Sequence, residues 1–120
     1  MAKANLQLIY VSDIRYSTVL YTNLLDEPHT VTPRYVAFSA DDKGKSTFAL
    51  WAGEKPIPDL KRSNEVGIML EADSDVDEAF ENYKCLPGIT VIDPPCNHVF
   101  GRSFLLKDPD GHLIRVCSRD

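Results

Sequence analysis

Two predicted β-strands and the turn between them occupy one stretch, Val99-Phe-Gly-Arg-Ser-Phe-Leu-Leu-Lys-Asp-Pro-Asp-Gly-His-Leu-Ile-Arg-Val-Cys117. The turn lies at Asp108-Pro-Asp-Gly111, because proline presets φ for the second turn position and glycine tolerates the positive φ that often follows. Branched and aromatic side chains, which favour strands, dominate on both sides of the turn. On local grounds the stretch is a C-terminal hairpin whose apolar residues are interrupted by Arg102, His112 and Arg115.

Upstream of this hairpin, the sequence predicts a strand, a helix and a further strand. The first strand is expected at 65–71, and Asp73 or Ser74 is the expected cap of the helix that follows. The helix carries apolar residues at i, i+3, i+4 and i+7, namely Val76, Ala79, Phe80 and Tyr83. A strand at 88–93 and a loop at Pro94-Pro95 then lead into the hairpin.

The first half of the chain repeats the same order of elements. A strand is expected at 5–11, followed by a helix that Ser12 or Asp13 caps with a side-chain oxygen. Extended segments are then expected at 29–32, 34–39 and 46–51. The proline-rich, charged segment 54–64 has no periodicity and is interpreted as a linker.

This repeat determines the predicted fold class. The order β-α-β-β-β occurs at about 5–53 and again at about 65–118, with little sequence identity between the halves. We therefore expect residues 1–120 to form one α+β domain that is built from two βαβββ modules.

The composition is that of an ordinary globular protein, with 43% hydrophobic and 26% charged residues among 120. A net charge of -5 argues against nucleic acid or an anionic membrane surface as the main partner. The chain has no apolar run of membrane-spanning length and no signal peptide, so a cytoplasmic location is expected. Cys85, Cys96 and Cys117 lack metal or disulfide spacing and are expected to be free thiols.

A duplicated βαβββ module that ends in Asp-Pro-Asp-Gly resembles the glyoxalase, bleomycin-resistance and extradiol-dioxygenase superfamily, whose fold is the vicinal oxygen chelate fold. Tyr10-Val-Ser-Asp-Ile14 and Phe104-Leu-Leu-Lys-Asp-Pro-Asp-Gly-His112 carry this resemblance. It implies curled mixed sheets that face one another around a hollow, and two chains that share modules as a homodimer.

Within the superfamily, the chain more closely resembles the phenazine antibiotic resistance proteins. The matching blocks are Asn5-Leu-Gln-Leu-Ile-Tyr-Val-Ser12, Val31-Thr-Pro-Arg-Tyr-Val-Ala-Phe38, Phe48-Ala-Leu-Trp-Ala-Gly53, Gly67-Ile-Met-Leu70, and Val99-Phe-Gly-Arg-Ser-Phe104 running on to Cys117. The resemblance implies a small binding protein that holds planar tricyclic aromatic antibiotics and keeps them from their targets.

The enzymes of the superfamily hold a metal at four strand positions, which correspond to Leu6, Ala49, Gly67 and Arg115 in this chain. The first three side chains cannot donate a lone pair, and an arginine cation repels a divalent metal. A metal-dependent lyase or dioxygenase is therefore not expected, and neither is any other cofactor.

The same positions suit a ligand-binding surface, and strand alternation brings their neighbours to the same face. The residues expected to bind a ligand are Leu8, Tyr10, Tyr35, Ala49, Trp51, Gly67, Met69, Glu71, Phe104 and Arg115. Trp51 offers a face for stacking, although it can instead fill the sheet-end core or a dimer contact. Met69 is equally well read as core filler. Phe48 and Leu50 are expected to pack beneath the first helix.

Arg115 needs a partner, because an unpaired charge in a hollow is costly. Glu71 can neutralise it structurally, or a ligand carboxylate can do so functionally, and the sequence leaves both open.

We therefore expect metal-free binding and sequestration of a phenazine-like antibiotic. The sequence shows no nucleophile–base pair or acid–base dyad. Cys96 and His98 are a conceivable pair, but residues two apart in a proline-rich loop are more often neighbours by accident than a catalytic site. Two alternatives stay open: a metal-independent enzyme that uses Glu71 for acid–base chemistry, and a binder of an endogenous aromatic metabolite.

Overall fold

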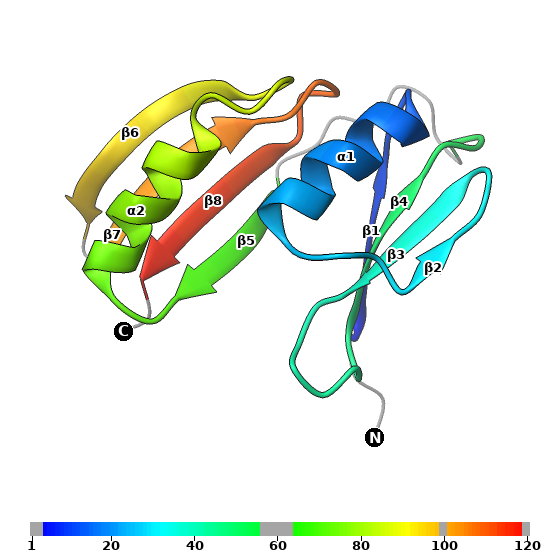
Figure 1. Ribbon diagram of the computed structural model, residues 1–120, viewed down its shortest axis with the longest axis horizontal. Coiled ribbons are helices and arrows are strands. Elements are labelled where there is room, and N and C mark those ends of the chain that lie inside the picture. The colour runs from blue at the N-terminus through cyan, green and yellow to red at the C-terminus, as the bar shows by residue number, and fades with distance from the viewer. Residues whose placement is uncertain (1–3, 56–63, 99–100, 119–120) are drawn as a thin grey trace. The chain divides into compact units, whose positions relative to one another are not determined.

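The computed structural model describes residues 4–55, 64–98 and 101–118. The chain divides into two compact units, Met1–Leu60 and Lys61–Asp120, and each contains a four-stranded mixed sheet with one helix (Figure 1). The predicted repeat of βαβββ modules and the α+β class are thereby confirmed. Most of the expected linker at 54–64 lies outside the described residues. Neither helix in the described parts of the chain has the length and apolar content needed to cross a membrane.

The first unit contains β1 (Leu6–Tyr10), α1 (Ile14–Leu24), β2 (Thr30–Val31), β3 (Tyr35–Ser39) and β4 (Thr47–Trp51). Its sheet has the order β1-β4-β3-β2, with β1 parallel to β4 and the other pairs antiparallel. Asp13 caps α1, because its carboxylate accepts a hydrogen bond from the backbone N–H of Tyr16 at 3.1 Å. Of the two caps that the sequence allows, the structure uses Asp13.

The core of the first unit lies between α1 and one face of the sheet. Phe48 packs on Tyr21 of α1 with ring centroids 5.2 Å apart, and on Phe38 with centroids 6.2 Å apart. All three rings are buried, as is Leu50. The prediction that Phe48 and Leu50 pack beneath the helix is confirmed for this face of β4.

The second unit contains β5 (Glu65–Leu70), α2 (Asp73–Tyr83), β6 (Thr90–His98), β7 (Gly101–Lys107) and β8 (Leu113–Ser118). Its sheet has the order β5-β8-β7-β6, with β5 parallel to β8. The prediction that Asp73 or Ser74 caps α2 is wrong. Ala72 occupies the N-cap position, and the carboxylate of Asp75 accepts its backbone N–H at 3.1 Å.

The prediction of a loop at Pro94-Pro95 is also wrong, because β6 continues through both prolines as far as His98. Proline removes a backbone N–H, so a strand tolerates it at a sheet edge or at a bulge. β6 is the edge strand of its sheet, and its pairing with β7 shifts register on both sides of Asp93.

The turn between β7 and β8 is built on Asp108, which is almost completely buried. Its carboxylate accepts the backbone N–H groups of Asp110 at 2.9 Å and His112 at 2.8 Å. Gly111 adopts a positive φ of 85°, which glycine permits without strain. The predicted hairpin and its Asp-Pro-Asp-Gly turn are confirmed.

Candidate functional site

Each sheet has one face covered by its own helix and a second face turned away from that helix. In the first unit, Phe48 points toward α1, so alternation turns its neighbours Ala49 and Trp51 to the second face. Residues directly opposite each other on paired strands share a face. We call this second surface the aromatic face, and it contains Leu8, Tyr10, Tyr35, Ala37, Ala49 and Trp51.

The aromatic face carries a row of three aromatic side chains on adjacent strands. Tyr10 on β1 lies opposite Trp51 on β4, and Trp51 lies opposite Tyr35 on β3. All three side chains are partly exposed. The next row across the sheet is smaller, because Ala49 lies between Leu8 and Ala37. The face therefore combines an aromatic wall with a floor of short side chains.

The predicted ligand-binding residues of the first unit differ in their exposure to solvent. Leu8, Tyr10 and Tyr35 are partly exposed, whereas Ala49 is completely buried. Ala49 therefore shapes the floor beneath its neighbours and offers no surface of its own.

The indole of Trp51 is held by the segment that follows β4. A methyl group placed on Gly53 would lie 2.2 Å from the indole carbon Cζ2, so the indole packs directly against this glycine. The indole N–H donates a long hydrogen bond of 3.4 Å to the carbonyl of Glu54. Trp51 is thus ordered by its own loop, and its donor is directed to protein, which leaves the ring surface as its main means of recognition.

In the second unit, the face turned away from α2 carries Arg115, and we call it the arginine face. Its members are Glu65, Gly67, Met69, Ser103, Leu105, Arg115 and Cys117, which the strand pairings place together. Met69 is 57% exposed, which rules out its interpretation as core filler. A methyl group added at Gly67 would meet no atom within 4 Å, so the surface beside this glycine is open.

Arg115 pairs with Glu65 in a two-pronged ion pair. Its Nε donates to Oε1 of Glu65 and its Nη2 donates to Oε2, both at 3.1 Å, while Nη1 donates to the hydroxyl of Ser103 at 3.1 Å. The hydrogen bond to Glu65 raises the pKa of Arg115 above its ordinary value, against an opposing effect of burial.

Glu65 is thus a carboxylate partner of Arg115 that stands beside the two considered from the sequence, Glu71 and a ligand carboxylate. Glu71 lies just beyond the end of β5 and is exposed, whereas Glu65 begins the strand. Sequence reasoning missed Glu65: side-chain alternation places it on the same face as Gly67, but its pairing with Arg115 depends on the register of β5 against β8. Gly67 lies opposite Arg115, and Glu65 is two residues earlier and so on the same face.

The structure also corrects the expectation that Phe104 contacts a ligand. Phe104 lies opposite Val116, one position out of phase with Arg115, and therefore faces α2. It is completely buried and packs edge-on against Phe80 of that helix, with ring centroids 5.2 Å apart. Its role is in the core of the second unit.

Cys96 and His98 come closer than the sequence suggested. Both lie in β6, and the sulfur of Cys96 is 3.0 Å from Nε2 of His98. Both side chains are exposed. Residues two apart on a strand point to the same side, which explains the contact without a loop.

Within the described ranges, no group of three or more histidine, cysteine, aspartate or glutamate side chains is arranged to hold a metal ion. The four positions equivalent to the metal ligands of the superfamily enzymes lie on β1, β4, β5 and β8. That the protein works without metal stays a prediction.

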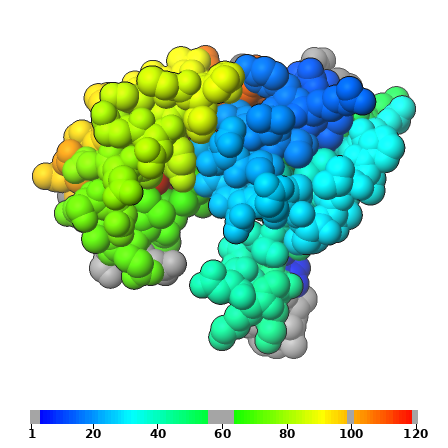
Figure 2. Space-filling view, viewed as in Figure 1, coloured from blue at the N-terminus to red at the C-terminus, as the bar shows by residue number. Residues whose placement is uncertain are grey.

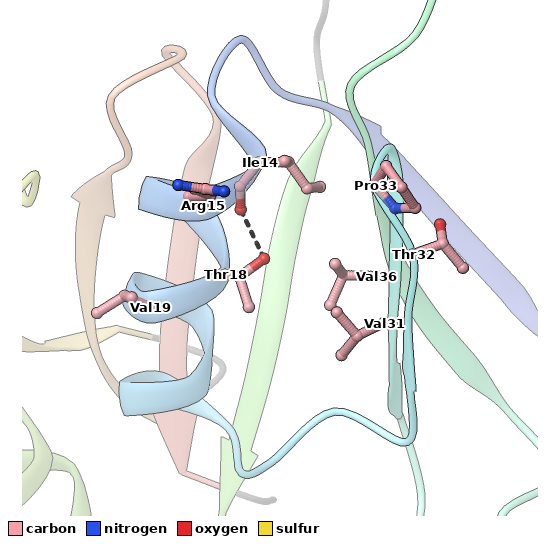
Figure 3. Close-up of a pocket in the computed structure, with 8 residues that line it drawn as sticks. All are labelled: Ile14, Arg15, Thr18, Val19, Val31, Thr32, Pro33 and Val36. Carbon is pink, nitrogen blue, oxygen red and sulfur yellow. Dashed lines mark hydrogen bonds between the residues drawn. The ribbon is translucent and has the colours of Figure 1, made fainter.

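A groove of about 550 Å³ lies in the first unit between α1 and the β2–β3 edge, and Figure 3 shows its lining. Its walls are mainly apolar and include Ile14, Val31 and Val36, with Arg15 on the helix side. Val36 faces α1, so the groove is on the opposite side of the sheet from the aromatic face. Figure 2 shows α1 and the β2–β3 segment side by side on the surface. Sequence reasoning did not predict this groove.

Comparison with known proteins identifies the family of the chain. The glyoxalase-like domain family matches residues 4–119. The phenazine antibiotic resistance protein EhpR of Enterobacter agglomerans is 48% identical over 120 residues, covering 97% of this chain and 92% of that protein.

Solved structures give the same fold. Protein ATC0852 from Agrobacterium tumefaciens superimposes with a TM-score of 0.84 at 27% identity, over 100% of this chain and 99% of that one. A glyoxalase-related enzyme from Fulvimarina pelagi has a TM-score of 0.83 at 16% identity, over 99% and 89%. The fosfomycin resistance protein FosX from Listeria monocytogenes, solved with Mn(II), has a TM-score of 0.78 at 19% identity, over 100% and 92%. The chain therefore belongs to the glyoxalase-like domain family, and its resemblance to a phenazine antibiotic resistance protein extends over nearly its whole length.

Proposed function

We propose that this protein binds a planar aromatic antibiotic of the phenazine type without a metal and confers resistance by sequestering it. The observation that carries the proposal is the row of Tyr10, Trp51 and Tyr35 on the aromatic face. The likeness to EhpR supports the class of ligand. We further propose that the protein acts in the cytoplasm as a homodimer.

The aromatic row offers a flat, fused ring system a stacking surface that extends over three strands. Adjacent strands are about 4.8 Å apart, so three side chains in register span about 10 Å across the sheet. Each stacked aromatic pair contributes about 0.5–1.5 kcal/mol beyond the burial of apolar area. Because stacking requires no charge and no proton transfer, this surface is suited to holding a ligand unchanged.

The proposed ligand contacts fall into one set in each unit. In the first unit they are Leu8, Tyr10, Tyr35 and Trp51, with Ala49 in the floor. In the second unit they are Gly67, Met69 and Arg115, and Glu65 joins them through its ion pair with Arg115.

The proposal is tested by titrating chelator-treated protein with phenazine-1-carboxamide, using isothermal calorimetry and the fluorescence of Trp51, which is the single tryptophan of the chain. We expect saturable binding with quenching, unchanged by added zinc or nickel, and a loss of at least about tenfold in affinity for Trp51→Ala. Binding that requires metal would refute metal-free sequestration.

A second variant separates the aromatic face from the groove beside α1. Val31 lines the groove and is 67% exposed, so Val31→Trp fills the groove without entering the core. We expect Val31→Trp to bind in calorimetry as the wild type does. Lost binding in Val31→Trp with retained binding in Trp51→Ala would move the site to the groove.

The alternative of a metal-independent enzyme of this fold is tested in the same samples. Ligand recovered after long incubation is expected to be chemically unchanged by chromatography and mass spectrometry. A converted product that depends on the protein would establish turnover. Growth in a phenazine with and without the gene would then distinguish resistance from the binding of an endogenous aromatic metabolite.

A further inference from the structure

We propose that Cys96 and His98 form a nucleophile–base pair, at which a small peroxide oxidises the thiol of Cys96 to a sulfenic acid. The sulfur of Cys96 lies 3.0 Å from Nε2 of His98, which is within the reach that a nucleophile and its base require. The pair is a site of covalent modification and is separate from the residues proposed to contact the aromatic ligand.

Neighbouring side chains determine the direction in which the pair points. Arg102 of β7 donates from Nε to the carboxylate of Asp77 on α2 at 2.7 Å, and from Nη1 to the side-chain oxygen of Asn97 on β6 at 3.1 Å. Asn97 therefore points to the side of the sheet that α2 covers. Because successive residues of a strand alternate, its two neighbours Cys96 and His98 point to the opposite side, which is the side of the arginine face.

The thiol is open to a small reagent. The side chains of Cys96 and His98 are both exposed, and β6 is the edge strand of its sheet. The groove beside α1 belongs to the first unit and contains neither residue. A peroxide suits such a position, because a molecule of this size reaches an exposed sulfur without a binding pocket of its own. Reactive cysteines are typically accessible in this way and have a basic or cationic neighbour.

The histidine supplies the proton acceptor that the reaction needs. A cysteine attacks as its thiolate, whereas an ordinary thiol is mostly protonated at neutral pH. In the tautomer that carries its proton on Nδ1, His98 accepts the S–H proton at Nε2. The thiolate then attacks one oxygen of the peroxide, so that an S–O bond forms as the O–O bond breaks. Sulfur is oxidised by two electrons and the peroxide is reduced. The hydroxide that leaves takes the proton from the imidazolium and becomes water, which leaves Cys96 as a sulfenic acid.

The sheet register keeps this product from closing a disulfide with the nearest thiol on the same side. Cys96 on β6 lies opposite Ser103 on β7, and Ser103 lies opposite Cys117 on β8. Two strand spacings, about 10 Å, separate the two cysteine backbones. A disulfide requires Cα atoms within about 7 Å of each other. The sulfenic acid of Cys96 therefore persists until a thiol from solution attacks it.

The test locates the oxidation by hydrogen peroxide in the full-length protein. Dimedone, which traps sulfenic acids, is added with the peroxide at neutral pH, and labelled peptides are quantified by mass spectrometry. Cys85 is the internal reference, because it is also exposed but has no hydrogen bond to a histidine in the ranges that the structure describes. We expect Cys96 to be labelled at least about tenfold faster than Cys85, since a positioned base accelerates a reaction by about 10²–10⁴-fold. Equal rates at Cys96 and Cys85 would overturn the inference.

His98→Gln removes the base and keeps a polar side chain. In this variant we expect the rate at Cys96 to fall at least about tenfold, while the rate at Cys85 stays within about twofold. His29→Gln is the matched control, because His29 is another exposed histidine, in the first unit and in contact with Thr30. It is expected to leave both rates unchanged within about twofold. An unchanged rate at Cys96 in His98→Gln would overturn the inference, and the comparison within wild-type protein decides alone if the variant does not fold.

Discussion

Adding one methyl group to Gly53 tests how the tryptophan of the aromatic face is held. A Cβ at this position would lie 2.2 Å from Cζ2 and 2.6 Å from Nε1 of Trp51. The φ of Gly53 is outside the left-handed region, so Gly53→Ala adds a steric contact without backbone strain. To restore a separation of 3.4 Å, the indole must move by about 1.2 Å, and the 3.4 Å hydrogen bond to Glu54 is then lost.

The expected cost follows from the exposure of the ring. Overpacking a closed core costs about 1–3 kcal/mol. Because the indole is partly exposed, it can swing outward, and we expect the free energy of unfolding to fall by about 1 kcal/mol. A displaced indole also loses its stacking geometry, which is worth about 0.5–1.5 kcal/mol, or up to about tenfold in Kd.

Three measurements check this expectation in one variant. The emission of Trp51 is expected to shift to longer wavelength, denaturant unfolding to give the lower stability, and calorimetry with phenazine-1-carboxamide the weaker binding. Gly67→Ala is the control for stability, because its added methyl meets no atom within 4 Å. Unchanged emission and stability in Gly53→Ala would show that the indole does not rest on this glycine.

Three further predictions concern the core, a turn and the metal. Phe104→Ala is expected to lower the free energy of unfolding by about 3–5 kcal/mol in denaturant titrations, because the buried ring leaves a cavity beside Phe80; a loss under 1 kcal/mol would contradict its core position. For Asp41, desolvation raises the pKa, but hydrogen bonds from backbone N–H groups such as that of Lys45 outweigh it and hold the pKa below 3.8. The stability that these bonds contribute is thus complete above pH 3.8, the pKa in the unfolded chain, and is lost as the pH falls through the lower pKa of the folded protein. An NMR titration of Asp41 with a midpoint above 3.8 would refute this. Removal of metal by a chelator is expected to leave ligand affinity unchanged in calorimetry, whereas restoration of binding by added zinc would show a metal site.

The parts of the fold that local chemistry dictates could be predicted from the sequence. The Asp108–Gly111 turn follows from proline and glycine at positions where a turn needs them, and the hydrogen bonds of Asp108 agree. The inward direction of Phe48 follows from the alternation of side chains along β4. Both predictions use residues within one element or one turn.

The parts that depend on pairing between distant segments could not be predicted. Glu65 becomes the partner of Arg115 through the register of β5 against β8, and nothing within either segment specifies that register. Phe104 stands in a run with Leu105 and Leu106, all buried, so apolar residues on both faces hide which of them faces the helix. The groove beside α1 likewise depends on how the helix packs on its sheet.

The two prolines of β6 have a consequence for how copies of this protein meet. An edge strand presents unpaired N–H and C=O groups on which another chain can add a strand. β6 forms an outer edge of its sheet, and of the N–H groups that Pro94 and Pro95 lack, alternation along the strand assigns one to each side, so the outer edge loses a donor. A neighbouring chain therefore finds a broken hydrogen-bond template there, which hinders fibre-like growth of the sheet.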